Sequence, residues 1–229
     1  ICSGLVGSEM CIRDRIEKRS KFLTNYQDKA YAERYVALLK RVQEVERKRT
    51  PTADGLVLAV AKNAFKLMAY KDEYEVARLF SDGSFIKKIK QQFEGDYKIE
   101  FNLAPPLISK KDPITGQLKK RTFGPWMMNA FRLLAKLKVL RGTAFDIFGK
   151  TEERKTERNL IEQYFGLVDM VLSNLNNENH QTSIELLSLP EQIRGYGHVK
   201  EKAIKMVKSK ERQLLERFNH PELSKTAAE

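Results

Sequence analysis

The segment TEERKTERNLIEQYFGLVDMVLSNL, residues 151–175, has the clearest helical pattern in the chain. Thr151 suits an N-cap because its hydroxyl can accept a backbone N–H, and Glu152 and Glu153 follow in the first turn, where the helix dipole favours negative charge. Seven apolar residues recur at three- and four-residue steps: Ile161, Tyr164, Phe165, Val168, Val171, Leu172 and Leu175. This spacing predicts a long amphipathic helix.

Helical spacing recurs before this segment. Residues 28–49 repeat the pattern, with Asp28 as a candidate N-cap. Residues 50–80 are more apolar, with Thr50 as the expected N-cap and Pro51 at the first helical position, where the missing N–H costs nothing. We therefore expect one long, deeply buried helix there. Further helices are predicted after the cap at 81–83, over 126–140, near 184–187 and from His198 onward.

One segment has the period of a β-strand. Apolar residues alternate with polar ones from Tyr97 to Leu103, and Pro105-Pro106 then stops the pattern. Good turn residues follow at 112–116. The sequence thus predicts a mainly α fold with one β-hairpin-like arm around residues 97–123.

The first 15 residues resemble translated sequencing-adapter sequence. They contain no initiating Met and no apolar run long enough for a signal peptide. We expect residues 1–15 to be non-native and the natural chain to extend further on its N-terminal side. Residues 16–220 are then expected to form a single helical domain, and residues 221–229 a frayed tail.

The composition excludes several classes of protein. The chain has 42 Lys and Arg against 30 Asp and Glu, a net charge of +12, with 41% hydrophobic residues. This composition excludes a disordered tail and a membrane span, and we expect a cytoplasmic protein. Both cysteines, Cys2 and Cys11, lie in the adapter-like segment, so cysteine-ligated metal centres and cysteine catalysis are excluded from the remainder.

No catalytic constellation stands out. His180 and His220 are expected to be surface residues, while His198 follows two glycines at a helix start and could bind an anion, although a plain polar cap is favoured. One set of carboxylates lies among basic residues in 151–175 and predicts a solvated charged face: Glu152, Glu153, Glu157 and Glu162.

A basic run is the main anomaly of composition. Residues 113–145 contain no Asp or Glu but seven basic residues: Lys119, Lys120, Arg121, Arg132, Lys136, Lys138 and Arg141. A second basic group comprises Arg194, His198 and Lys200. Either group could contact nucleic acid, coenzyme phosphates, an acidic protein or only water. Phe123, Trp126 and Phe131 could supply stacking rings, but their spacing favours core packing.

Several separated strings carry a resemblance to a known family. They are AKNAFKLMAYKDEYEVARL (61–79), FNLAPPL (101–107), FGPWM (123–127), LKVLRGTAFDIFG (137–149) with TEERKTERNLI (151–161), and PEQIRGYGHVKEKAI (190–204). In this order they resemble the C-terminal domain of the large fused indolepyruvate ferredoxin oxidoreductases, a branch of the 2-oxoacid:ferredoxin oxidoreductases. The resemblance runs from Ile16 to about Arg217.

The resemblance implies a parent enzyme that oxidatively decarboxylates aryl 2-oxoacids to acyl-CoA and passes electrons to ferredoxin. Such enzymes use thiamine diphosphate, Mg²⁺ and [4Fe-4S] clusters and act as homo-oligomers. None of these cofactors can be assigned to residues 16–229, so we expect them in upstream domains and this segment alone to be inactive.

Two roles for the segment are compatible with its residues. Apolar helix faces and the arm at 97–123 could pack on the catalytic domains or at a subunit interface, or the basic residues could attract CoA phosphates or ferredoxin. The alternative, independent of the family, is a free-standing basic module that binds nucleic acid or an acidic protein.

Overall fold

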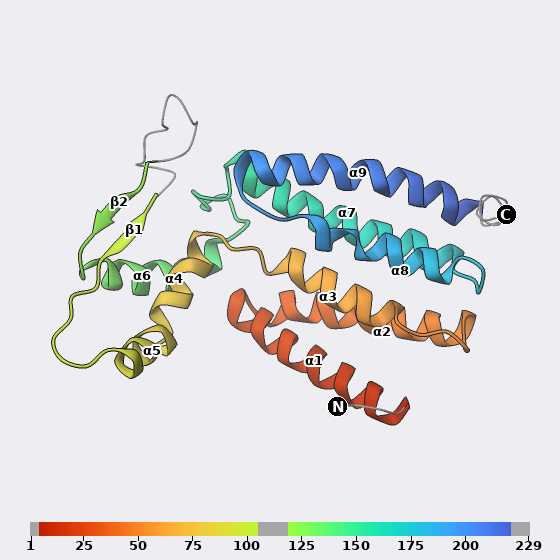
Figure 1. Cartoon of the computed structure of the whole chain (residues 1–229), viewed down its shortest axis with the longest axis horizontal. Helices are drawn as coiled ribbons and strands as arrows, with labels where there is room; N and C mark the ends of the chain where they lie inside the picture. The colour runs from red at the N-terminus through yellow and green to blue at the C-terminus, as the bar shows by residue number, and fades with distance from the viewer. Residues whose placement is uncertain (1–4, 105–118, 221–229) are drawn as a thin grey trace. The chain divides into compact units, whose positions relative to one another are not determined.

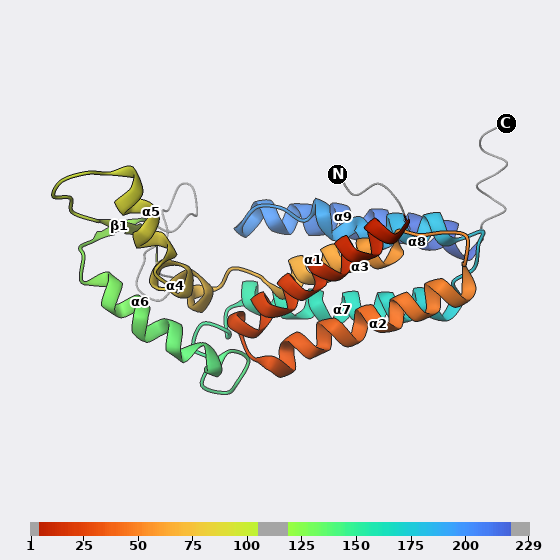
Figure 2. The ribbon, with the colours of Figure 1, turned by 90° about the horizontal axis from the view of Figure 1, so that it is seen from below.

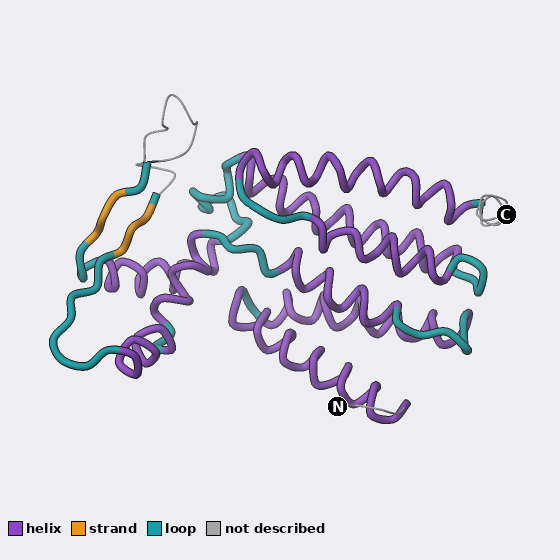
Figure 3. Tube along the Cα trace, in the orientation of Figure 1, coloured by secondary structure: helices purple, strands orange, loops and turns teal. Residues whose placement is uncertain are grey.

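The structure is a computed structural model that describes residues 5–104 and 119–220. These residues form α-helices joined by loops, with one small two-stranded antiparallel sheet (Figure 3). The predicted mainly α fold is confirmed. Contacts divide the chain into two compact units: unit 1 combines residues 1–70 with 149–229, and unit 2 is Lys71–Phe148. Residues 16–220, expected as one domain, thus span both units.

Unit 1 is a helical bundle. Its elements are α1 (Leu5–Tyr26), α2 (Lys29–Arg49), α3 (Leu56–Met68), α7 (Glu152–Asn174), α8 (His180–Ser188), the 3-10 helix η2 (Leu189–Gln192) and α9 (Gly197–Asn219) (Figure 1). Helix α3 contacts α1, α2, α7 and α8, so it lies at the centre of the bundle, as the view in Figure 2 also indicates. This position explains why α3 is so apolar.

The predicted caps of two helices in unit 1 are confirmed. The Asp28 carboxylate accepts the N–H of Tyr31 at 2.8 Å, and the Thr151 hydroxyl accepts the N–H of Arg154 at 3.4 Å. Helix α7 then buries five residues of the stripe predicted from the sequence, and it also buries Leu160. The five are Ile161, Tyr164, Val168, Val171 and Leu172.

Buried tyrosines tie the helices of unit 1 to backbone carbonyls. Tyr35 donates to Ala61 O at 3.0 Å and Tyr164 donates to Leu187 O at 2.9 Å. Burial raises the pKa of both phenols, because the apolar surroundings disfavour the phenolate. Each hydroxyl therefore stays neutral and joins two helices.

Unit 2 is smaller and contains the sheet. Its elements are α4 (Glu73–Ser81), α5 (Ser84–Gln92), β1 (Phe101–Leu103), β2 (Arg121–Phe123), α6 (Met127–Lys136) and the 3-10 helix η1 (Leu137–Leu140). Its buried core consists of Ala77, Phe101, Met127 and Phe131. The Phe80 ring stacks on Phe131 at 5.0 Å between centroids.

The expected β arm is present as a short antiparallel pair. Phe101 pairs with Phe123, and Leu103 pairs with Arg121. The strand pattern expected over residues 97–103 shortens to three residues. Pro105-Pro106 and the expected turn at 112–116 lie outside the described residues, as does the tail at 221–229.

The prediction of one helix over residues 50–80 is wrong. Thr50 is the C-cap of α2, and α3 begins only after Gly55, whose φ of 106° favours glycine. The chain then leaves helical geometry before Asp72, whose carboxylate accepts the N–H of Glu75 at 2.8 Å and caps α4. An internal N-cap, which apolar periodicity does not reveal, therefore divides the segment.

Helix α1, whose first eleven residues fall in the segment expected to be non-native, is not among the predicted helices. The helix nevertheless contributes to the core, since Leu23 and Tyr26 are fully buried. Among the described helices, none combines the length and apolar character needed to cross a bilayer.

Candidate functional site

Arg141 departs from the expected exposed basic face. It is buried in unit 2, where Nε lies 2.5 Å from Asp72 Oδ2 and Nη2 lies 2.9 Å from Asp72 Oδ1. Its guanidinium also lies over the Tyr74 ring at 5.6 Å. This bidentate pair joins the start of α4 to the loop after η1, so Arg141 is a structural residue.

The loop that follows Arg141 is braced by a second buried carboxylate. Asp146 accepts the Gly142 N–H at 2.8 Å and the Tyr74 hydroxyl at 3.2 Å. Burial, together with the charge of Asp146, raises the pKa of Tyr74. The residues on either side, Phe145 and Ile147, are exposed. The contacts thus fix a loop that holds two apolar side chains in solvent.

Of the other predicted cations of unit 2, Lys138 is half-buried and five are exposed: Lys119, Lys120, Arg121, Arg132 and Lys136. Arg121 lies on β2, whereas Arg132 and Lys136 lie on α6. The Arg132 guanidinium donates to Asn129 Oδ1 at 3.0 Å. Contact of these exposed cations with a partner stays a prediction.

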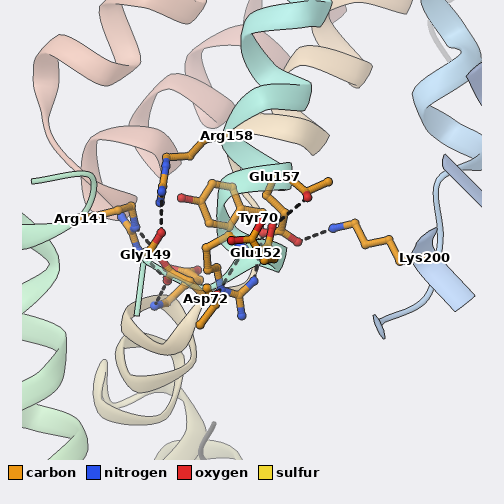
Figure 4. A network of polar contacts seen from close by, with 12 residues as sticks. Tyr70, Asp72, Arg141, Gly149, Glu152, Glu157, Arg158 and Lys200 are labelled. Carbon is orange, nitrogen blue, oxygen red and sulfur yellow. Dashed lines mark hydrogen bonds and ion pairs between the residues drawn. The ribbon is translucent and has the colours of Figure 1, made fainter. Parts of the chain in front are cut away.

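In unit 1, Lys200 is bound by a carboxylate of the same unit. Glu157 on α7 accepts from Arg154 Nη1 at 3.0 Å and from Lys200 Nζ at the start of α9 (Figure 4). Only 6% of Glu157 is exposed, so the prediction that it belongs to a solvated charged face is wrong. Arg158 Nη2 also donates to Gly149 O at 2.5 Å. These contacts hold α9 and the chain before α7 onto α7.

Two cations that the sequence did not single out, Lys62 and Lys66, lie on α3 beside η2. Lys66 Nζ donates to Pro190 O at 2.6 Å and to Glu191 O at 3.0 Å. Burial lowers the pKa of Lys66, and the nearby Arg194 lowers it further. Lys62 Nζ lies 2.7 Å from Glu191 Oε2, and this hydrogen bond lowers the pKa of the Glu191 carboxyl. The sequence signal that could have identified these two lysines is their i,i+4 spacing, which places both on one face of a helix.

Arg194 and His198 are both exposed. Arg194 Nε donates to Glu191 O at 3.2 Å. His198 lies in the first turn of α9, whose N-cap residue Tyr196 makes no side-chain cap hydrogen bond. Arg194 lies in the loop before α9, whereas His198 and Lys200 lie in the first turn of α9, where Lys200 is paired with Glu157.

His180 corrects another expectation, because it is buried. Its Nε2 lies 3.0 Å from Glu46 Oε1. Sequence spacing could not reveal this pair, since the two residues are 134 positions apart. Within residues 5–104 and 119–220, no group of three or more His, Cys, Asp or Glu side chains is arranged to hold a metal ion.

The fold and these contacts define a helical protein in which buried ion pairs and tyrosine hydroxyls join the helices. The chain belongs to a family of unknown function, DUF6537, whose model matches residues 12–213. No curated protein and no solved structure matches the chain.

Proposed function

We propose that this chain is a non-catalytic C-terminal domain of an enzyme that oxidatively decarboxylates indolepyruvate and related aryl 2-oxoacids to acyl-CoA, with ferredoxin as electron acceptor. The ordered strings between residues 61 and 204 support the enzyme class by resemblance. The family itself has no assigned activity, so the resemblance alone supports this part of the proposal.

The exposed apolar side chains of unit 2 support a packing role. Thirteen large hydrophobic residues are exposed in the described chain, and nine lie in unit 2, which has about half as many residues as unit 1. The nine are Leu79, Phe93, Tyr97, Trp126, Leu133, Leu137, Val139, Phe145 and Ile147. A concentration of this kind marks a surface that another protein surface covers. In this proposal the partners are the upstream catalytic domains or a second subunit.

In this proposal the cofactors of the parent enzyme lie outside this chain. An iron–sulfur cluster needs several spaced thiolates, whereas the chain has only Cys2 and Cys11. Thiamine diphosphate needs Mg²⁺ held by oxygen ligands, and the described carboxylates that are buried are taken up by arginine, lysine, histidine or backbone N–H groups. We therefore assign these cofactors, and the CoA site, to upstream domains of a cytoplasmic, homo-oligomeric parent enzyme.

The test begins with the gene. The source locus is re-amplified and read upstream of Ile16, and the complete protein and this chain are purified separately. We expect indolepyruvate- and CoA-dependent reduction of ferredoxin by the complete protein and none by the chain alone. An upstream reading frame without a thiamine-diphosphate motif and spaced cysteines would refute the proposal.

A second candidate is a free-standing basic helical module, favoured by the net charge of +12 and by the run without acidic residues at 113–145. Fluorescence anisotropy with labelled RNA and DNA across a salt series distinguishes it. Tight binding that weakens steeply with salt would favour the module. Binding that is weak at every salt concentration would leave the packing role as the better account.

A further inference from the structure

Helix α6 presents apolar side chains both to the core and to solvent. Its inward face buries Met127 and Phe131 in the core of unit 2. On the outward side, Trp126 is 61% exposed, Leu133 is 63% exposed and Leu137 is 39% exposed. The core explains the first set, whereas the second set leaves much of its apolar surface open to solvent.

The three outward residues lie along one side of the helix, and we call them the α6 stripe. They are spaced by seven and by four residues, which correspond to about two turns and one turn of an α-helix. Trp126 directly precedes α6 with helical backbone angles, and Leu137 is its C-cap residue. The stripe therefore follows the whole helix, a length of about 16 Å.

Positive charge accompanies the stripe. Arg132 and Lys136 are exposed on the same helix, and Asn129 Oδ1 accepts a hydrogen bond from Arg132 Nη1. Unit 2 as a whole has 15 Lys and Arg against 9 Asp and Glu, a net charge of +6. A surface that covers the stripe must match both its apolar line and its positive flank.

We propose that the α6 stripe is the face by which this chain docks on an acidic, apolar protein surface of the catalytic part of its parent enzyme. The proposal rests on the proposed function and names its contact surface. Charge complementarity points to an acidic occupant, because a second copy would bring another net +6 unit against the first. Nucleic acid would use the cations, but its phosphates gain nothing from the aliphatic Leu133 and Leu137.

The test measures the accessibility of position 133 in two proteins. Leu133→Cys is made in the complete protein encoded at the locus and in this chain alone, and its maleimide-labelling rate is followed by peptide mass spectrometry. Because Leu133 is 63% exposed, the substitution leaves the core of unit 2 intact. Met206→Cys on α9, at a position that is 58% exposed, is the matched control.

We expect labelling at position 133 to be at least about tenfold slower in the complete protein than in the chain, with no such difference at position 206. Equal rates at position 133 would overturn the proposal. Slow labelling of the isolated chain would overturn it as well. If the isolated chain labels slowly, the cause of its protection can be identified. A labelling rate that falls with protein concentration would indicate a second copy. Faster labelling after nuclease treatment would indicate bound nucleic acid, and faster labelling after removal of bound lipid would indicate a membrane surface.

The acidic character of the occupant has its own test. Arg132→Glu in the complete protein should restore faster labelling of Leu133→Cys by about tenfold, because it sets like charges against each other. Lys88→Glu on α5, an exposed site in the same unit, is the control and should have no effect. An unchanged rate with Arg132→Glu would overturn the assignment of an acidic occupant.

Labelling and enzymatic activity separate the two proposals. Protection of position 133 in a protein without oxidoreductase activity would refute the proposed function and leave the docking face in place. Activity together with an unprotected position 133 would support the function and refute the docking face.

Discussion

The carboxylate of Glu46, near the end of α2, lies 3.0 Å from His180 Nε2 at the first residue of α8. The same carboxylate accepts the N–H of Leu56 at 2.8 Å and the N–H of Val57 at 3.1 Å. These are the first two residues of α3, and the N-cap Gly55 supplies no side-chain acceptor. Glu46 therefore caps α3 from another helix, where a negative charge also favours the helix dipole. One buried side chain joins three helices.

Glu46→Gln should lower the free energy of unfolding by about 2–3 kcal/mol, because it removes charge from two backbone hydrogen bonds and from the contact with His180 in a buried site. Urea denaturation at neutral pH measures the change. Glu44→Gln, an exposed position on the same helix, should shift the free energy by no more than about 0.5 kcal/mol. Equal losses in the two variants would contradict the capping role.

Tyr164 predicts how stability depends on alkaline pH. Burial raises the pKa of its phenol well above the usual value of 10.0, so above pH 10 the unfolded chain loses a proton that the folded chain keeps. The folded state then binds one more proton, and the free energy of unfolding falls as pH rises. The contribution is complete below about pH 10, and the slope above it is about 1.4 kcal/mol per pH unit.

Tyr164→Phe should lower that slope by about 1.4 kcal/mol per pH unit, whereas the buried Tyr35 and Tyr74, whose pKa values are also raised, keep their own contributions. At neutral pH it should destabilise the protein by about 1 kcal/mol, since the hydrogen bond to Leu187 O is lost. Urea denaturation between pH 9 and 12 measures both effects. The control is Tyr196→Phe, because Tyr196 is 70% exposed, and it should leave the profile unchanged. A wild-type slope retained in Tyr164→Phe would contradict the assignment.

Much of the fold follows from local signals in the sequence. Asp28 and Thr151 could be identified as caps because a cap needs only a short polar side chain before an apolar periodic run. The β pair at 101–103 and 121–123 follows from the change of period in the same way. The break at Asp72 was missed because apolar residues continue through 50–80 with nearly helical spacing, and the cap lies inside them.

The charged residues were harder to predict, because their partners lie far away in the sequence. Arg141 meets Asp72 across 69 positions, and Lys200 meets Glu157 across 43. Composition identified a basic run correctly, but it could not separate a buried arginine from an exposed one such as Arg132. Only the tertiary fold makes that distinction.

The Asp72–Arg141 pair should control the stability of unit 2. Asp72→Asn should destabilise it by about 3–5 kcal/mol, because a buried guanidinium is left without its charged partner and α4 loses its charged cap. Hydrogen exchange of residues 73–81 should accelerate. Arg132→Gln, on the exposed face of α6, should leave exchange there unchanged. An equal acceleration in both variants would contradict the distinction between these two arginines.

Lys200 can be assigned to a structural role or to partner contact by one comparison. If its ammonium serves mainly to neutralise Glu157, then Lys200→Met leaves that carboxylate with Arg154 alone, and the start of α9 should loosen. We expect the free energy of unfolding to fall by about 1–2 kcal/mol and hydrogen exchange over residues 197–207 to become faster. Lys202→Met is the control, because Lys202 is exposed two residues further along α9.

A residue kept for an external anion would behave differently, since its replacement would leave exchange of the free chain unchanged while weakening binding. Unchanged exchange in Lys200→Met would therefore return Lys200 to the candidate contacts beside Arg194 and His198.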